Sequence, residues 1–145
     1  MTPCSKVYKA FLNKVLEDDW EDFTEEQLEE DMSNILLSAL PRFKFPINST
    51  DLDETGENFL GDLNNKEIQI IASYMKCEWL NRNIMTYENI KPLYDERDFS
   101  QANLLSKFIQ ALAAEEKRAE KLESFYYRSP DNKPFKYRRL AGWKK

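Results

Sequence analysis

The sequence predicts a mainly α-helical protein, a small helical bundle of about four helices with a long C-terminal helix and an extended C-terminal arm. Apolar residues recur at helical spacing in four separate segments, and these segments begin at recognisable start signals. Glycine is scarce, with 3 residues in a chain of 145. This scarcity argues against a β-sandwich or barrel, because those folds need many tight turns.

The first two helices are predicted from their start signals and apolar faces. Thr2 followed by Pro3 is typical of an N-cap with proline at the first helical position, and the helix is expected to end near Leu16. Thr24 and Gln27 have the spacing of a capping box, which starts a second helix that ends at Pro41. The apolar faces are Val7, Phe11 and Val15 in the first helix, and Leu28, Met32, Ile35, Leu36, Ala39 and Leu40 in the second.

The segment between Pro41 and Asn65 has no helical period. Its start, RFKFPI, predicts an extended stretch, and the polar residues 48–58 predict an exposed loop. Asn64 and Glu67 again have capping-box spacing. The helix that follows is expected to run to about Asn81, with a further turn or short helix before Pro92. Its single apolar face comprises Ile68, Ile71, Ala72, Met75, Trp79 and Leu80.

The longest helix is predicted from Gln101 to about Tyr127, with Ser100 as its N-cap. Its middle section, AAEEKRAEKLE, is charged and carries only a narrow apolar strip, so we expect it to project past the core or to pack on another chain. We therefore divide the chain into a helical domain over residues 1–127 and an arm over residues 128–145. The expected buried face is Leu104, Leu105, Phe108, Ile109 and Leu112, continued more thinly by Ala119, Leu122 and Tyr126, and the expected subunit contacts are Arg118, Ala119, Leu122 and Tyr126.

Enzymatic chemistry is not expected from this sequence. The chain has no histidine, the residue that acid–base and nucleophilic sites use most often, and no glycine-rich phosphate loop. Ten of the fifteen residues 17–31 are acidic, but they lack the pattern of a calcium loop, so a solvated helix face is favoured over a metal or paired-carboxylate site. Cys4 and Cys77 form no metal-binding motif. We predict no cofactor, no metal site, no membrane segment, and two free thiols in a reducing cytoplasm.

The charge of the chain is unevenly distributed. From Arg128 onward, seven basic residues stand against the single acid Asp131, so the rest of the chain is strongly acidic. Arginine and aromatic residues dominate protein–protein hot spots, but they also grip nucleic acid by phosphate contact and stacking. Docking onto a partner protein is favoured over nucleic-acid binding and over intramolecular packing or disorder. The expected anchors are Phe135, Tyr137, Arg138, Arg139, Leu140 and Trp143.

Two stretches, LNNKEIQIIASYMKCEWLNRNI and DFSQANLLSKFIQAL, resemble head–tail connector (adaptor, neck or head-completion) proteins of tailed bacteriophages that infect Gram-positive bacteria. The arrangement is also similar, because an acidic helical half leads through an ALPRFKFP segment into these stretches. The resemblance covers roughly residues 25–127 and excludes the arm. The residues that carry it are Met75, Glu78, Trp79 and Leu80 in the first stretch, and Asp98, Phe99, Ser100, Gln101, Ala102, Asn103 and Leu104 in the second.

The resemblance implies a structural virion protein at the head–tail interface, assembled in the host cytoplasm. Subunits of such connectors form a homo-oligomeric ring, commonly a dodecamer, beneath the portal protein, with C-terminal segments reaching into the portal. The opposite face meets the tail or a stopper protein. An acidic body would suit a channel through which genomic DNA passes without sequence-specific binding. An alternative from another functional class is a small nucleic-acid-binding regulator that uses the basic C-terminal arm. A third possibility is a tail-terminator protein or another virion subunit.

Overall fold

The computed structural model describes residues 1–15, 20–90 and 99–128, with only the backbone described for Tyr87, Asn89, Ile90 and residues 99–102. Four α-helices dominate this described part, which confirms the predicted helical bundle with a long C-terminal helix. The elements are β1 (Thr2–Pro3), α1 (Cys4–Leu12), α2 (Glu25–Ala39), the 3₁₀ helix η2 (Leu40–Arg42), β2 (Asn58–Phe59), α3 (Asn65–Ile90) and α4 (Phe99–Arg128).

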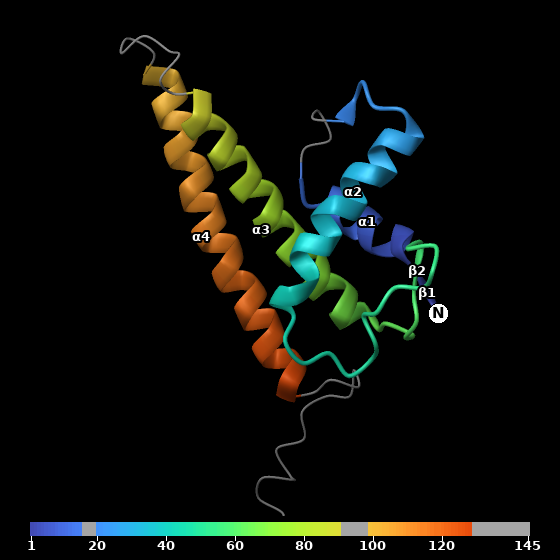
Figure 1. Ribbon diagram of the computed structural model, residues 1–145. Helices are drawn as coiled ribbons and strands as arrows, with labels where there is room; N and C mark the ends of the chain where they lie inside the picture. Colours follow the sequence, from blue (N-terminus) through green and yellow to red (C-terminus); the bar gives the residue numbers. More distant parts are fainter. Residues whose placement is uncertain (16–19, 91–98, 129–145) are drawn as a thin grey trace, which may run out of the picture.

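Helix α3 lies at the centre of the molecule, with α1 and α2 on one side and α4 on the other (Figure 1). It is one continuous helix to Ile90, so the predicted end near Asn81 is wrong. The predicted apolar face is buried except for Ile68, which is half-buried. A second face was missed, because a helix covered on two sides must be apolar on both. That second face includes Ile70, Tyr74 and Cys77, which are all buried.

Helix α1 begins differently from its prediction. Pro3 occupies the N-cap position, and no side chain caps the helix. The Thr2 hydroxyl instead donates a hydrogen bond to the Gly61 carbonyl (3.0 Å) and accepts one from the Leu63 N–H (2.8 Å). Thr2 and Pro3 pair with β2 in a short antiparallel ladder. The N-terminal residues therefore fasten α1 to the loop before α3. The predicted end near Leu16 is also late, because α1 ends at Leu12.

Both predicted capping boxes are present. In the first, the Gln27 N–H donates to the Thr24 hydroxyl (3.3 Å), and the Thr24 N–H donates to the Gln27 side chain (3.1 Å). In the second, Asn64 and Glu67 exchange the equivalent bonds at 2.9 Å each. Each box satisfies two backbone N–H groups that a helix N-terminus leaves without partners.

The loop between η2 and β2 is held by side chains. As predicted, the backbone is extended at Phe43, but only Phe43 of the RFKFPI aromatics is buried, and Phe45 is 71% exposed. The expected exposed loop of residues 48–58 ends in β2, which the sequence did not predict. Gly61 passes so close to Ser49 that a Cβ atom would lie 2.5 Å from its backbone nitrogen. The close approach therefore requires glycine at this position.

Helix α4 runs alongside α3 from Phe99 to Arg128 (Figure 1). It begins before Ser100, so this residue lies inside the helix and is not the predicted N-cap. Contacts from Trp79 to Phe108 and from Tyr74 to Glu123 show that the two helices are antiparallel. None of the described helices is long and apolar enough to cross a lipid bilayer.

Candidate interaction surfaces

Toward the end where its two helices are joined, the α3–α4 hairpin diverges from α2 (Figure 1). Several apolar side chains of the hairpin remain exposed there, and one of them, Met85, lines a pocket together with side chains of α2. Met85 is 55% exposed, Ile109 is 48% exposed and Leu104 is 37% exposed. The prediction that Leu104 and Ile109 are buried is therefore wrong. Phe108 and Leu112, from the same predicted face, do pack against the core and are half-buried.

The predicted subunit contacts on α4 occupy three different environments. Ala119 is fully buried and Tyr126 is 1% exposed, both in the core of their own chain. Their expected place on the buried face of α4 is confirmed, but they are not available to a neighbouring subunit, so the predicted subunit contact is wrong for these two residues. Leu122 packs against the same core and is half-buried. Arg118 is exposed and remains available for a contact with another molecule.

Two acids in the charged middle of α4 are buried and have partners on distant segments, whereas the other charged residues of this stretch remain exposed or half-buried. Glu123 is 8% exposed and accepts hydrogen bonds from the Tyr74 hydroxyl (2.7 Å), the Tyr127 hydroxyl (2.7 Å) and the Lys44 backbone N–H (3.2 Å). Glu115 is 5% exposed and lies 3.5 Å from the Lys76 ammonium. The sequence prediction treated these acids as surface residues, since their partners lie far away along the chain.

A third buried carboxylate, Glu67, joins α3, α4 and the loop. It is fully buried and accepts hydrogen bonds from the Tyr126 hydroxyl (3.0 Å), the Asn48 backbone N–H (3.1 Å) and the Asn48 side chain (2.6 Å). The Tyr126 hydroxyl also accepts from the Ile47 N–H (2.8 Å). Burial raises the pKa of Tyr126 to about 12, so the hydroxyl keeps its proton at neutral pH.

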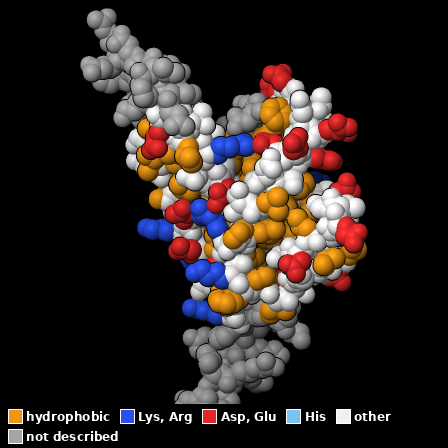
Figure 2. All heavy atoms as spheres, in the orientation of Figure 1, with side chains coloured by type: hydrophobic (Ala, Val, Ile, Leu, Met, Phe, Trp, Pro, Cys, Tyr) orange, Lys and Arg blue, Asp and Glu red, His pale blue; other side chains and the backbone are white. Residues whose placement is uncertain are grey.

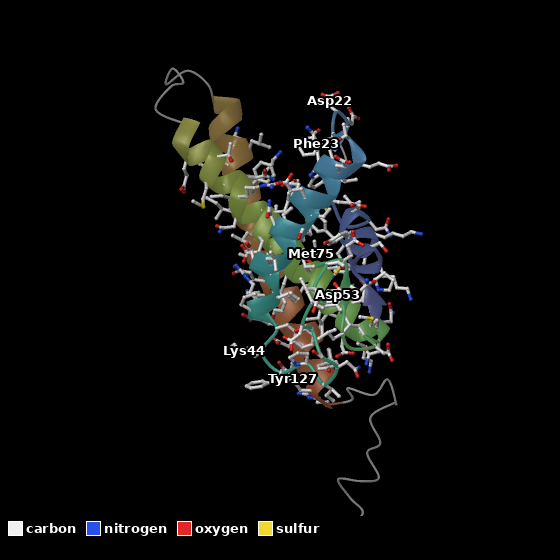
Figure 3. The ribbon with its side chains drawn as sticks, turned by 45° about the vertical axis from the view of Figure 1, so that its right-hand side comes forward. Asp22, Phe23, Lys44, Asp53, Met75 and Tyr127 are labelled. Carbon is white, nitrogen blue, oxygen red and sulfur yellow. The ribbon has the colours of Figure 1, made fainter. Side chains whose placement is uncertain are left out.

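An exposed surface formed by Phe45, Ile47 and Tyr127, which we call the aromatic ledge, lies where α4 ends. The rings of Phe45 and Tyr127 are 6.0 Å apart, and Ile47 beside them is 64% exposed. Figure 3 shows Tyr127 and Lys44 together at this end of the molecule. The Arg128 guanidinium lies over the Phe125 ring, 5.6 Å from its centre. The predicted anchors of the arm, Phe135, Tyr137, Arg138, Arg139, Leu140 and Trp143, lie outside the described residues.

Helix α2 carries a row of exposed acids. The acidic side chains of Figure 2 gather around α2 at the end of the molecule where Figure 3 labels Asp22 and Phe23. Asp31, on the inner side, accepts hydrogen bonds from the Trp20 indole (2.6 Å) and from Arg82 (2.7 Å). Among the described residues, no three metal-ligating side chains are grouped closely enough to hold an ion. The exposed acids of the row are Glu25, Glu26, Glu29 and Glu30.

The two cysteines are free thiols within the core. Burial raises the pKa of Cys4 to about 11 and that of Cys77 to about 12. Because the thiolate is the nucleophilic form, neither side chain is reactive at neutral pH. Their role in this fold is packing.

Comparisons with protein-family models, with curated proteins and with solved structures gave no significant match.

Proposed function

We propose that this protein is a structural virion subunit, a head–tail connector of a tailed bacteriophage that forms a ring beneath the portal and carries out no reaction. The exposed apolar side chains of the α3–α4 hairpin are the observation that carries the proposal. Its partly exposed apolar residues Met85, Leu104 and Ile109 are suited to burial against another molecule. A neighbouring copy in a ring supplies such a surface along the length of the hairpin.

Two of the segments that resemble connector proteins meet in the fold. Arg42, in the ALPRFKFP segment, donates a 2.7 Å hydrogen bond to Glu78 in α3. Met75, Trp79 and Leu80 from the same stretch of α3 are buried in the core. The ALPRFKFP segment and the stretch from Met75 to Leu80 thus belong to one structural unit.

The two ends of the described molecule suggest how such a subunit divides its contacts. The aromatic ledge of Phe45, Ile47 and Tyr127 adjoins the start of the basic arm, and together they suit docking to the portal protein. The acidic row on α2 lies toward the other end (Figure 3). There it would face the tail or a stopper protein, or repel genomic DNA that passes through the ring. The site of action is then the virion neck.

The hairpin contact is tested with the double substitution Leu104→Glu and Ile109→Glu. Both side chains are partly exposed, so the variant should fold, and its circular dichroism should match the wild type. We expect it to lose ring assembly on purified portal particles, measured by co-sedimentation and negative-stain imaging. Leu37→Glu is the matched control, because Leu37 is 54% exposed on α2 and should leave assembly unchanged. Normal rings from the double variant would contradict the proposed role of the hairpin.

Truncation after Arg128 tests the arm separately. The shortened protein should stay folded but no longer co-sediment with portal particles. Binding of random duplex DNA by the full chain, steeply reduced by salt and lost on truncation, would instead favour the nucleic-acid-binding regulator.

A further inference from the structure

A cleft at the meeting point of three helices is lined by cationic and amide side chains. Lys14 lies just beyond the end of α1, Lys76 is on α3 and Arg118 is on α4. Asn13 and Gln69 add amide groups, and Ala10 completes the lining. No acidic residue is among these lining residues, so the cleft presents hydrogen-bond donors and positive charge to whatever enters it.

The positive charge of the cleft is only partly neutralised by its own chain. Within the part of the chain that the structure describes, Lys76 pairs with Glu115 at 3.5 Å, whereas Lys14 and Arg118 form no ion pair. Burial lowers the pKa of Lys14, and repulsion from Arg118 and Lys76 lowers it further, while the charge of Glu115 acts in the opposite direction without cancelling these effects. An anion bound between Lys14 and Arg118 would relieve that repulsion.

The same chain carries a complementary surface on another helix. Glu25, Glu26, Glu29 and Glu30 are exposed, and their spacing places them along one side of α2. These four carboxylates make no ion pair with any described residue. No residue of α2 lines the cleft. The acidic row of one copy can therefore bind the cleft of a second copy while the cleft of the first copy binds the acidic row of a third.

The overall charge disfavours nucleic acid as the occupant of the cleft. The chain has a net charge of −5, and the basic residues concentrated in the arm leave the folded body more acidic still. A long polyanion would be repelled by that body, whereas a short row of carboxylates meets the cleft locally. The contact also joins two different patches, and such head-to-tail contacts produce rings when the rotation closes.

We propose that the cleft formed by Lys14, Lys76 and Arg118 binds the acidic row of α2 on a second copy of this chain. The contact is a lateral, head-to-tail interface with charge-assisted hydrogen bonds between ammonium or guanidinium groups and carboxylates. This inference rests on the proposed ring-forming function and identifies one of its subunit contacts.

Zero-length cross-linking tests the contact in the full-length protein. A mixture of ¹⁴N- and ¹⁵N-labelled protein, assembled on portal particles, is treated with a carbodiimide that joins lysine to nearby carboxylates. We expect mixed-isotope peptides that link Lys14 or Lys76 to the segment Glu25–Glu30. The Lys76–Glu115 pair within one copy, at 3.5 Å, is the internal positive control. The control product without the mixed-isotope product would overturn the proposal.

Charge reversal provides the second test. Lys14→Glu with Arg118→Glu should weaken subunit association about tenfold or more, as should Glu26→Lys with Glu29→Lys. All four substitutions in one chain should restore association, because both patches then have reversed sign. Lys117→Glu with Lys121→Glu is the matched control, since both lysines are exposed on α4 outside the cleft. Circular dichroism checks that each variant is folded.

The possible failures are distinguishable. If the wild type assembles and the cleft variants assemble equally well, the cleft contact is wrong while the ring function stands. If the wild type does not associate even on portal particles, both proposals fail. If duplex DNA or inorganic phosphate binds the wild type and not the cleft variants, and subunit association is unchanged, the cleft is an anion site and the second-copy assignment is overturned.

Discussion

Individual buried carboxylates connect segments that are far apart in the sequence, and Glu67 makes the largest set of such hydrogen bonds described above. Its two oxygens accept hydrogen bonds from Asn48, Asn64 and Tyr126, which come from the loop, the start of α3 and the end of α4. A buried carboxylate is tolerated only when it is bonded in this way. Glu67 thus acts as a junction between segments that are remote in sequence.

Replacing Glu67 by glutamine should destabilise the protein by about 3 kcal/mol. The amide NH₂ group would face donors where the carboxylate offered acceptors, and buried donors would lose their partners. Urea denaturation followed by tryptophan fluorescence measures the change. Glu120→Gln is the control, because Glu120 is exposed on α4 and its replacement should change stability by less than about 0.5 kcal/mol. A loss of the same small size at Glu67 would contradict the junction role.

At the scale of elements, Asp31 connects α2 to α3 and to Trp20. Burial acts to raise the pKa of this carboxyl, but hydrogen bonds from Arg82 and Trp20 and the charge of Arg82 outweigh it and lower the pKa below its usual value. A carboxyl with a lowered pKa stabilises the fold above about pH 4, its unfolded-state pKa, and this stabilisation is lost as the pH falls through the folded-state pKa.

Asp31→Asn should therefore destabilise the protein more at pH 7 than at pH 3. At the lower pH the wild-type carboxyl is itself becoming protonated, so the difference between the two proteins should shrink. Urea unfolding at both pH values gives the comparison. Glu30→Gln, a change at an exposed neighbour, should make little difference at either pH. If Asp31→Asn lowers the stability equally at both pH values, the charge of Asp31 contributes nothing to the contact between α2, α3 and Trp20.

The sequence predicted the elements whose signals are local. The capping boxes at Thr24 and Asn64 depend on residues three positions apart, so they are visible in the sequence and are present in the structure. The second apolar face of α3 and the burial of Glu123 depend on packing between segments far apart in the chain. Lys44, for example, lies 79 residues from Glu123. No local pattern encodes such a contact, and these are the features that the prediction missed.

The candidate surfaces were predicted less well than the helices, for the same reason. Exposure of Leu104 and Ile109 follows from the packing of α4 mainly along α3, and burial of Ala119 and Tyr126 follows from the same packing further along α4. Both depend on the arrangement of the whole bundle. Arg118 is the one predicted subunit contact that also lines the proposed cleft.

For the whole molecule, a core shared by all four helices implies that unfolding is cooperative. The reactivity of Cys4 on α1 and of Cys77 on α3 can be used to follow this unfolding. Because both thiols are buried with raised pKa values, a disulfide reagent at pH 8 should modify them only as fast as the protein opens. In denaturant both should react at once, and a Cys4→Ser variant assigns the remaining signal to Cys77. Rapid reaction of either thiol in the native protein would contradict a single shared core.

The loop that follows η2 is held in place mainly by hydrogen bonds from its backbone N–H groups. Its backbone N–H groups at residues 44, 45, 47 and 48 all donate to side chains of α3 or α4, and Pro46 has none to donate. Any residue except proline supplies an N–H, so these bonds place no demand on the side chains of residues 44, 45 and 47, whereas Asn48 also donates to Glu67 through its side chain. Divergent descendants of this chain could change those three residues and still keep the path of the loop, provided that they retain Asn48 and the acceptors Glu67, Glu123, Tyr126 and Tyr127.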